Sequence, residues 1–315
     1  MSKFLEMLRG DSTQVSIIVG TAVAVLILLA INYGTRTGII ARATLKEIVR
    51  QPVFLLLGLI GSAIIMINVV VPFFAFEDDT RMFIECGIAT AQITALIMAV
   101  WTASTSVAEE IEGKTAMTLL SKPVNRQQFI LGKYFGILQA GWLILFIIGV
   151  VFFCCTYFKF GYDSGEHGQL PPPMFTYPLE GSMKWLPYLV PQRLEVAMSI
   201  LPGLTLVAFE VAIMAAISVA ISTRFPMLVN ILACLSVFVL GHLTPLLAIS
   251  AVHPIVAFVA KLFATICPVL EHFNIQGNMD AVRPEYLANA LLYCCAYSVL
   301  MLMAALISFE DRDLA

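Results

Sequence analysis

Residues that could do chemistry gather in one mixed-charge stretch, EEIEGKTAMTLLSKPVNRQQFILGK, which runs from Glu109 to Lys133. Within it, Gly113, Lys114 and Thr115 match the last residues of a phosphate-binding loop. That loop also needs a glycine at the position where this chain has Ala108, and a β-strand where this chain has a long apolar run. The match is therefore too short to predict a nucleotide site, and we expect this chain not to hydrolyse ATP itself.

A second chemistry would combine Glu109 and Glu110 with His242 to activate a water or a metal-bound hydroxide. The segments EEIEGK and FVLGH resemble the E-E-x-x-x-R and F-x-x-x-H motifs of the CAAX-processing and Abi family of membrane proteases. However, Lys114 replaces the arginine, and we expect Glu110 and His242 at different depths of the membrane. Catalytic groups must reach a common water, so the protease stays the alternative hypothesis.

The composition requires elements that can lie in lipid. Hydrophobic residues make up 60% of the chain and charged residues 12%, whereas about a quarter of the residues of a soluble domain are charged. We predict an all-α membrane protein with seven transmembrane helices, because seven stretches approach the roughly 20 apolar residues that a span needs. The lipid bilayer is thus one partner, and we expect no nucleic acid. The predicted spans are 12–35, 51–76, 86–108, 134–158, 196–223, 225–260 and 286–309.

The distribution of Lys and Arg predicts the orientation of these spans, since cytoplasmic loops carry an excess of both. More than half of the 18 Lys and Arg residues fall in the segments 34–52, 107–133, 222–227 and 309–315. We therefore place these segments in the cytoplasm, with the N-terminus outside and the C-terminus inside. The first span is long for a signal peptide and no small-residue cleavage site follows it, so we expect it to be retained.

Three segments between the spans have distinct patterns. In 36–51, Arg42, Lys46 and Arg50 recur every four residues, which predicts an interfacial amphipathic helix that ends before Pro52. The proline-rich segment 157–195 predicts an ordered outer loop or small cap without long helices. The apolar but interrupted segment 251–285 predicts short re-entrant helices in the outer half of the bilayer.

Cysteine and histidine give no sign of a metal site. The seven Cys include the adjacent pairs Cys154–Cys155 and Cys294–Cys295, and neither pair has a C-x-x-C spacing. No His or Met has ligand spacing with another. We expect no metal in this chain.

The mixed-charge stretch has the features of a mechanical element. The third span continues into EEIEG, Gly113 permits a bend, and KTAMTLLS can form a short helix that Pro123 ends. Asn125 and Gln128 resemble a capping box that begins the fourth span. The short helix would present Met117, Leu119 and Leu120, flanked by Lys114 and Lys122, to a groove of a soluble partner.

The same stretch resembles the signature of ABC-2-type permeases, especially the subgroup named for multicopper-enzyme maturation. The pattern is roughly E-x-x-x-G-T-x-x-x-L-L-S-x-P-V-x-R-x-x-F-x-x-G-K, with Lys114 as an insertion in this chain. The matching residues are Glu109, Gly113, Thr115, Leu119, Leu120, Ser121, Pro123, Val124, Arg126, Phe129, Gly132 and Lys133.

This resemblance implies a permease domain over residues 36–315, with residues 1–35 as an extra transmembrane helix, because the family core has six spans. It implies a half-transporter that pairs with a second permease copy or paralogue and with separate ABC-type ATPase subunits, which bind the ATP and Mg; the chain itself needs no cofactor. Residues 113–122 would be the coupling helix. The implied ATPase-coupling residues are Glu109, Glu110, Gly113, Lys114, Thr115, Met117, Leu119, Leu120, Ser121, Lys122, Pro123 and Arg126.

Family analogy favours export across the plasma membrane, the bacterial inner membrane, and leaves the substrate open. An ATP-independent carrier or structural membrane subunit is a further alternative.

Inside the spans, Glu210 is the one formal charge, and an ion at that depth costs roughly 2.5–3.5 kcal/mol. It must face protein or a wet cavity, and we place Glu210 and Gln92 on a translocation path or dimer interface, with a packing contact as the alternative for Glu210. For Gln92, Gln139 and Asn230 an interhelical hydrogen bond is also expected.

Overall fold

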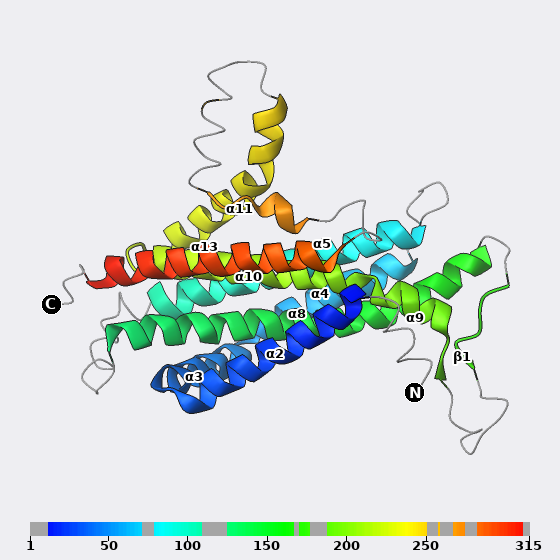
Figure 1. Cartoon of the computed structure of the whole chain (residues 1–315), viewed down its shortest axis with the longest axis horizontal. Coiled ribbons are helices and arrows are strands. Elements are labelled where there is room, and N and C mark those ends of the chain that lie inside the picture. Colours follow the sequence, from blue (N-terminus) through cyan, green and yellow to red (C-terminus); the bar gives the residue numbers. More distant parts are fainter. Residues whose placement is uncertain are drawn as a thin grey trace.

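A computed structural model describes residues 12–70, 79–108, 125–166, 170–176, 188–250, 258, 267–274 and 282–310. Long helices lie side by side along the longest axis of the molecule, and a two-stranded antiparallel sheet lies near one end (Figure 1). The helices are α2 (Ser12–Gly34), α3 (Arg36–Arg50), α4 (Pro52–Val70), α5 (Asp79–Ala103), the π-helix η1 (Ser104–Ala108), α8 (Arg126–Glu166), α9 (Pro191–Met198), α10 (Ile200–Ser222), α11 (Met227–Ser250), the 3-10 helix η2 (Leu270–Phe273) and α13 (Pro284–Glu310); the strands are β1 (Phe175–Thr176) and β2 (Tyr188–Leu189).

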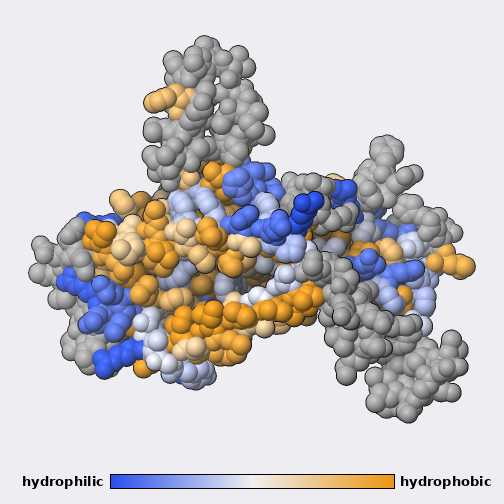
Figure 2. All heavy atoms as spheres, in the orientation of Figure 1, coloured by the Kyte–Doolittle hydropathy of each residue, from blue (hydrophilic) through white to orange (hydrophobic). Residues whose placement is uncertain are grey.

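The all-α membrane architecture predicted from the composition is confirmed. Within the described residues, six helices are long and apolar enough to cross a membrane, and the remaining predicted span, 225–260, has a shorter apolar part, Met227–Leu243. Apolar side chains lie along α2 and α13, and hydrophilic residues gather toward the two ends of the bundle (Figure 2). The six are Thr13–Gly34, Pro52–Val70, Asp79–Val107, Arg126–Gly165, Pro191–Ser222 and Pro284–Phe309.

The bundle has a buried centre and an exposed edge. Helix α10 is the most buried of the candidate spans, and α2 is the least buried. Apolar side chains of α2 such as Leu26 and Val19 are more than half exposed, as expected of a helix that faces lipid on most of its sides. Reciprocal side-chain hydrogen bonds of 2.9 and 3.1 Å join Asn32 of α2 to Gln139 of α8. The interhelical bond predicted for Gln139 is therefore confirmed.

Helix α3 has the predicted bounds and packs closely against α8. Gln51, the residue before Pro52, is extended at φ −68° and ψ 137°, which is the geometry that a following proline favours. Gly132 and Gly136 of α8 provide a small-residue surface for α3. A Cβ on Gly136 would lie only 2.7 Å from Cβ of Thr44 and 2.9 Å from the carbonyl oxygen of Ala41. Glycine is required at this contact because the two backbones approach so closely.

The prediction that a loop begins at residue 157 is wrong. Helix α8 continues to Glu166, although Lys159 and Asp163 lie in this part. Their side chains are one turn apart and form an ion pair of 3.1 Å, and the Lys159 side chain is only 1% exposed. Because each charge neutralises the other within the helix, neither one ends it. Likewise, α5 begins at Asp79, before the predicted residue 86, and Arg81 and Glu85 form a similar pair of 3.7 Å on it.

The end of the bundle that carries β1 and β2, predicted to be the outer cap, is fastened to α8 by Arg193 of α9, which is buried. Its guanidinium donates to the carbonyl oxygen of Pro172 at 2.5 Å and to that of Tyr157 at 3.2 Å. Tyr157 in turn donates to the carbonyl oxygen of Met174 at 2.6 Å. These bonds hold the strand segment at the end of the bundle.

The predicted re-entrant segment, 251–285, lies largely outside the described residues. Between α11 and the residues before α13, only residue 258 and residues 267–274 are described.

Candidate functional site

A cluster of polar side chains lies inside the bundle where α5, α10 and α11 meet, and we call Gln92, Glu210 and His242 the intramembrane acid cluster. Nε2 of Gln92 donates to Oε2 of Glu210 at 2.6 Å and lies 3.4 Å from Nε2 of His242. The same His242 nitrogen is 3.7 Å from Oε1 of Glu210. The structure thus brings together the two residues predicted for a path or interface, Glu210 and Gln92, and adds His242.

Packing between α8 and α10 positions the carboxyl group of Glu210. The indole nitrogen of Trp142 donates to the carbonyl oxygen of Ala208 at 3.0 Å, and the hydroxyl of Tyr134 donates to that of Ala212 at 3.4 Å. These two α10 carbonyls lie on either side of Glu210 in the sequence. Side chains of α8 therefore fix the helical turn that carries the carboxyl group of Glu210. The side chains that contact this carboxyl group come from α5 and α11.

The hydrogen bond made by Nδ1 of His242 determines whether Nε2 donates or accepts. Nδ1 lies 3.0 Å from the carbonyl oxygen of Phe238, and since a carbonyl only accepts, Nδ1 carries the proton of this bond. In the neutral ring, Nε2 then accepts from Gln92. In the protonated ring, Nε2 carries a proton and a positive charge toward Oε1 of Glu210.

Glu210 is only 1% exposed, and its Oε1 has no hydrogen-bond donor within the described part of the chain. A buried carboxylate of this kind is costly unless a donor or a positive charge faces it. His242 keeps a side-chain exposure of 20%, so the cluster has one accessible side. Its chemistry suits the binding of a proton or of a positively charged group.

A second polar group lies toward one end of the same helices, and we call Ser104, Ser218, Ser222 and Asn230 the serine–asparagine cluster. Nδ2 of Asn230 lies within 2.8 to 2.9 Å of the three serine hydroxyls. An amide group has two hydrogens, so three acceptors share them. Asn230 is fully buried. The interhelical hydrogen bond predicted for Asn230 is confirmed, and it joins α11 to η1 and to the end of α10.

A buried lysine connects the same end of α5 to α8. Nζ of Lys133 donates to the hydroxyl of Ser106 at 2.9 Å, and the side chain of Lys133 is buried. Ser106 lies within the π-helix η1, whose wider turn is frequently found at functional sites. The residues that follow η1 are 109–124, which we call the coupling segment because they contain the predicted coupling helix, 113–122. The helix that enters the coupling segment is therefore fixed to three other helices.

Most of the predicted ATPase-coupling residues lie in the coupling segment, outside the described residues. Arg126 follows it, donates to the carbonyl oxygen of Phe309 at 3.3 Å, and lies over the Phe309 ring at 5.8 Å. Part of the predicted capping box is confirmed, because the backbone N–H of Asn125 donates to Oε1 of Gln128 at 3.3 Å. The members outside the described residues are Glu109, Glu110, Gly113, Lys114, Thr115, Met117, Leu119, Leu120, Ser121, Lys122 and Pro123.

The sequence did not identify Ser104, Ser106 or Lys133 as parts of an interhelical contact. Serine within a helix often bonds to its own backbone, as Ser104 also does with the Val100 carbonyl oxygen at 2.7 Å. Its position in a helix therefore does not show which neighbour it meets. The position of Lys133 in an apolar run was the available signal, since a lysine there needs a polar partner.

The geometry does not favour a metal site. Within the described residues, no group of three or more His, Cys, Asp and Glu side chains is arranged to hold an ion. The protease hypothesis joins His242 to Glu109 and Glu110, which lie outside those residues. The carboxyl group that faces His242 among the described residues is that of Glu210, from a different helix than the motif implies.

Comparison with known proteins supports the permease interpretation. The chain matches the ABC-2 family transporter proteins over residues 38–314, which is nearly all of its length. The match does not distinguish the multicopper-maturation subgroup, so that finer assignment stays a prediction. No individual curated protein matches the chain. The buried bundle, its intramembrane polar groups and this match lead to one conclusion: the chain belongs to the ABC-2 transporter family and is a multi-pass membrane permease of an ABC transporter.

Proposed function

We propose that this permease is one membrane half of an ATP-driven exporter, and that separate ATPase subunits move it through the coupling segment. The family supports a transport role, and the incomplete phosphate-binding motif supports ATP hydrolysis by another chain. A second permease copy or paralogue completes the membrane part. Residues 1–35 form an extra helix outside the permease domain of residues 36–315.

The observation that carries this proposal is the set of buried polar contacts at η1. Lys133 of α8 and Asn230 of α11 both bond to serines of η1, and Asn230 also bonds to Ser218 and Ser222 of α10. A push on the coupling segment would be passed on to each of these helices, because bonded and packed elements shift between discrete arrangements. This is the mechanical link that an ATPase partner needs.

The intramembrane acid cluster gives the proposed path its chemistry. It joins the helix that enters the coupling segment, α5, to α10 and α11. A displacement of α5 therefore changes the distance of Gln92 from Glu210. We infer that this change alternately exposes and covers a carboxyl group that faces cargo or the second permease.

Co-purification tests the proposal. The tagged chain, extracted from its native membrane, should retain an ATPase that mass spectrometry identifies and that hydrolyses ATP. The double variant Leu119→Asp with Leu120→Asp should abolish retention of the ATPase, because the predicted coupling helix would lose its apolar face. The matched control, Leu119→Met with Leu120→Met, keeps an apolar face and should retain the ATPase.

Two outcomes would overturn the proposal. Retention of the ATPase by the aspartate variant would remove the coupling segment from the interface. If purified chain without any ATPase cleaves peptides, and Glu110→Gln abolishes the cleavage, the protease hypothesis would replace it.

A further inference from the structure

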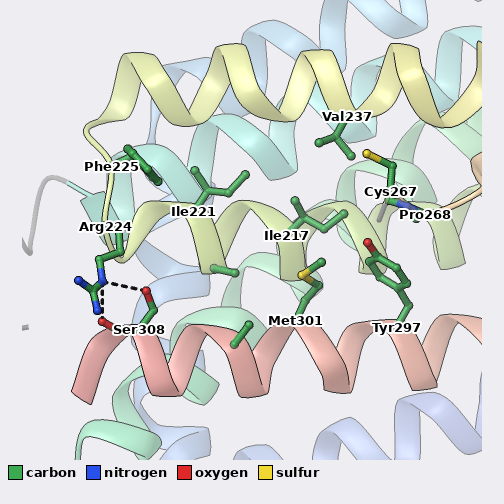
Figure 3. A pocket seen from close by; sticks show the side chains of 12 residues that line it. Ile217, Ile221, Arg224, Phe225, Val237, Cys267, Pro268, Tyr297, Met301 and Ser308 are labelled. Atoms are coloured by element: carbon green, nitrogen blue, oxygen red, sulfur yellow. Dashed lines mark hydrogen bonds between the residues drawn. The ribbon is translucent and has the colours of Figure 1, made fainter. Parts of the chain in front are cut away.

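A groove of about 300 Å³ lies between α11 and α13, with α10 as its floor (Figure 3). Ile217 and Ile221 of α10 form the floor, Val237 of α11 forms one wall, and Met301 of α13 forms the other. These side chains are apolar, and both walls belong to helices whose neighbouring side chains face outward. Leu232 of α11, for example, is 56% exposed. In a bilayer, the groove would therefore be filled by lipid or by another apolar group.

The two ends of the groove differ in chemistry (Figure 3). Arg224 and Ser308 lie at one end, and Nε of Arg224 donates to the carbonyl and hydroxyl oxygens of Ser308, each at 2.9 Å. Cys267, Pro268 and Tyr297 lie at the other end. The guanidinium is exposed, and its bonds to Ser308 hold it at the mouth of the groove.

The groove has the length of one leaflet. Ser308 and Tyr297 lie eleven residues apart on α13, which corresponds to roughly 16 Å at 1.5 Å per residue. The hydrocarbon part of one leaflet is about 15 Å thick, half of a core of about 30 Å. An acyl chain that enters beside Arg224 would thus end near the bilayer middle, where Pro268 and Tyr297 close the groove.

We propose that this groove binds one acyl chain of an anionic phospholipid, whose phosphate group contacts Arg224. An arginine fork matches phosphate oxygens in geometry and charge. The apolar walls match the acyl chain, and Arg224, the one charged residue among the described residues that line the groove, lies where the headgroup would be. The proposal concerns a resident lipid, so it does not depend on the cargo or on the ATPase.

Native mass spectrometry of the purified full chain tests this site with phosphatidylglycerol and phosphatidylcholine of identical acyl chains. Wild type should bind one phosphatidylglycerol about tenfold more tightly than phosphatidylcholine, the effect of a charge-assisted bond. Arg224→Gln should remove this preference. Ala304→Phe, which fills the groove from α13, should weaken the binding of both lipids.

Arg50→Gln is the matched control, because it removes an exposed arginine from outside the groove. It should leave the preference unchanged. Equal losses from Arg50→Gln and Arg224→Gln would overturn the site in favour of general charge attraction. If Ala304→Phe converts a dimer to a monomer and leaves lipid binding intact, the groove is an interface between copies. Unfolding curves check that the variants fold, and Ala304→Leu offers a smaller change at the same position.

Discussion

Gln92 and Glu210 are coupled by the shortest side-chain contact of the intramembrane acid cluster, 2.6 Å. We predict that Gln92→Leu lowers the free energy of unfolding by roughly 1–3 kcal/mol, because a buried carboxyl group then lacks its donor. Thermal or denaturant unfolding in detergent measures this loss. The double variant Gln92→Leu with Glu210→Leu should be less destabilised than Gln92→Leu alone, because both polar partners are then removed. Additive losses would show that the two side chains do not interact.

Asn230 gives a second prediction at this scale. Asn230→Leu should reduce ATP-driven transport more than it reduces the amount of folded protein, because α11 then loses its bonds to η1 and α10. Ser236→Ala is the control, since Ser236 lies on the same helix, is exposed and bonds to the Leu232 carbonyl oxygen. Equal effects of the two variants on transport would remove the serine–asparagine cluster from the mechanism.

The sequence predicted individual residues where a single charge stands out. Glu210 was found because it interrupts an apolar run, and such a charge must find a partner. The identity of that partner was only partly predictable. Gln92 lies 118 residues from Glu210 and 150 residues from His242 in the chain, and nothing in their local sequences states which helices pack together.

The contact between α3 and α8 leads to a prediction for these elements. Gly136→Ala should lower the melting temperature, because the added Cβ would lie within 3 Å of Thr44 and of the Ala41 carbonyl oxygen. Gly58→Ala is chemically the same change in α4, where an added Cβ meets nothing within 4 Å. It should keep or raise the melting temperature, since alanine favours helix over glycine. The same sign for both variants would contradict the close approach of α3 and α8.

Element boundaries were predictable where a residue stops a helix physically. Pro52 separated α3 from α4 as expected. Charges were a poor guide to the ends of α5 and α8. Spans drawn between charged residues were shorter than the real helices. In α8, for example, Lys159 and Asp163 form an ion pair along one helix face, so the helix continues past them. A charge pair spaced by four residues should therefore be read as compatible with a continuing helix.

The molecule as a whole has one end that we propose to be cytoplasmic, with contacts from Arg126 to Phe309 and from Arg224 to Ser308. In a variant without native cysteines, Lys46→Cys and Lys122→Cys should react with a membrane-impermeant maleimide only after the membrane is opened. Glu195→Cys on α9 should react in intact cells, because α9 lies beside the outer cap. Labelling of Lys122→Cys from outside would reverse the orientation and remove the coupling segment from any ATPase.

The fold class of the whole molecule followed from composition alone, since so few charges can fill the surface of a soluble domain. The arrangement of the helices did not. Helix α10 is hydrophobic on all sides and so gives no sign of which neighbours it meets. Its central place depends on contacts with α5, α8, α11 and α13 that come from distant parts of the chain.

Helix α8 contains 41 residues and is therefore about 60 Å long, roughly twice the thickness of the hydrocarbon layer. In a helix of this length, a small change of tilt moves one end by a large distance. If its Arg126 end is the pivot, a tilt of roughly five degrees displaces the far end by about 5 Å. Spin labels at Ser164 of two copies would report such a swing as a change in their separation when ATP is added.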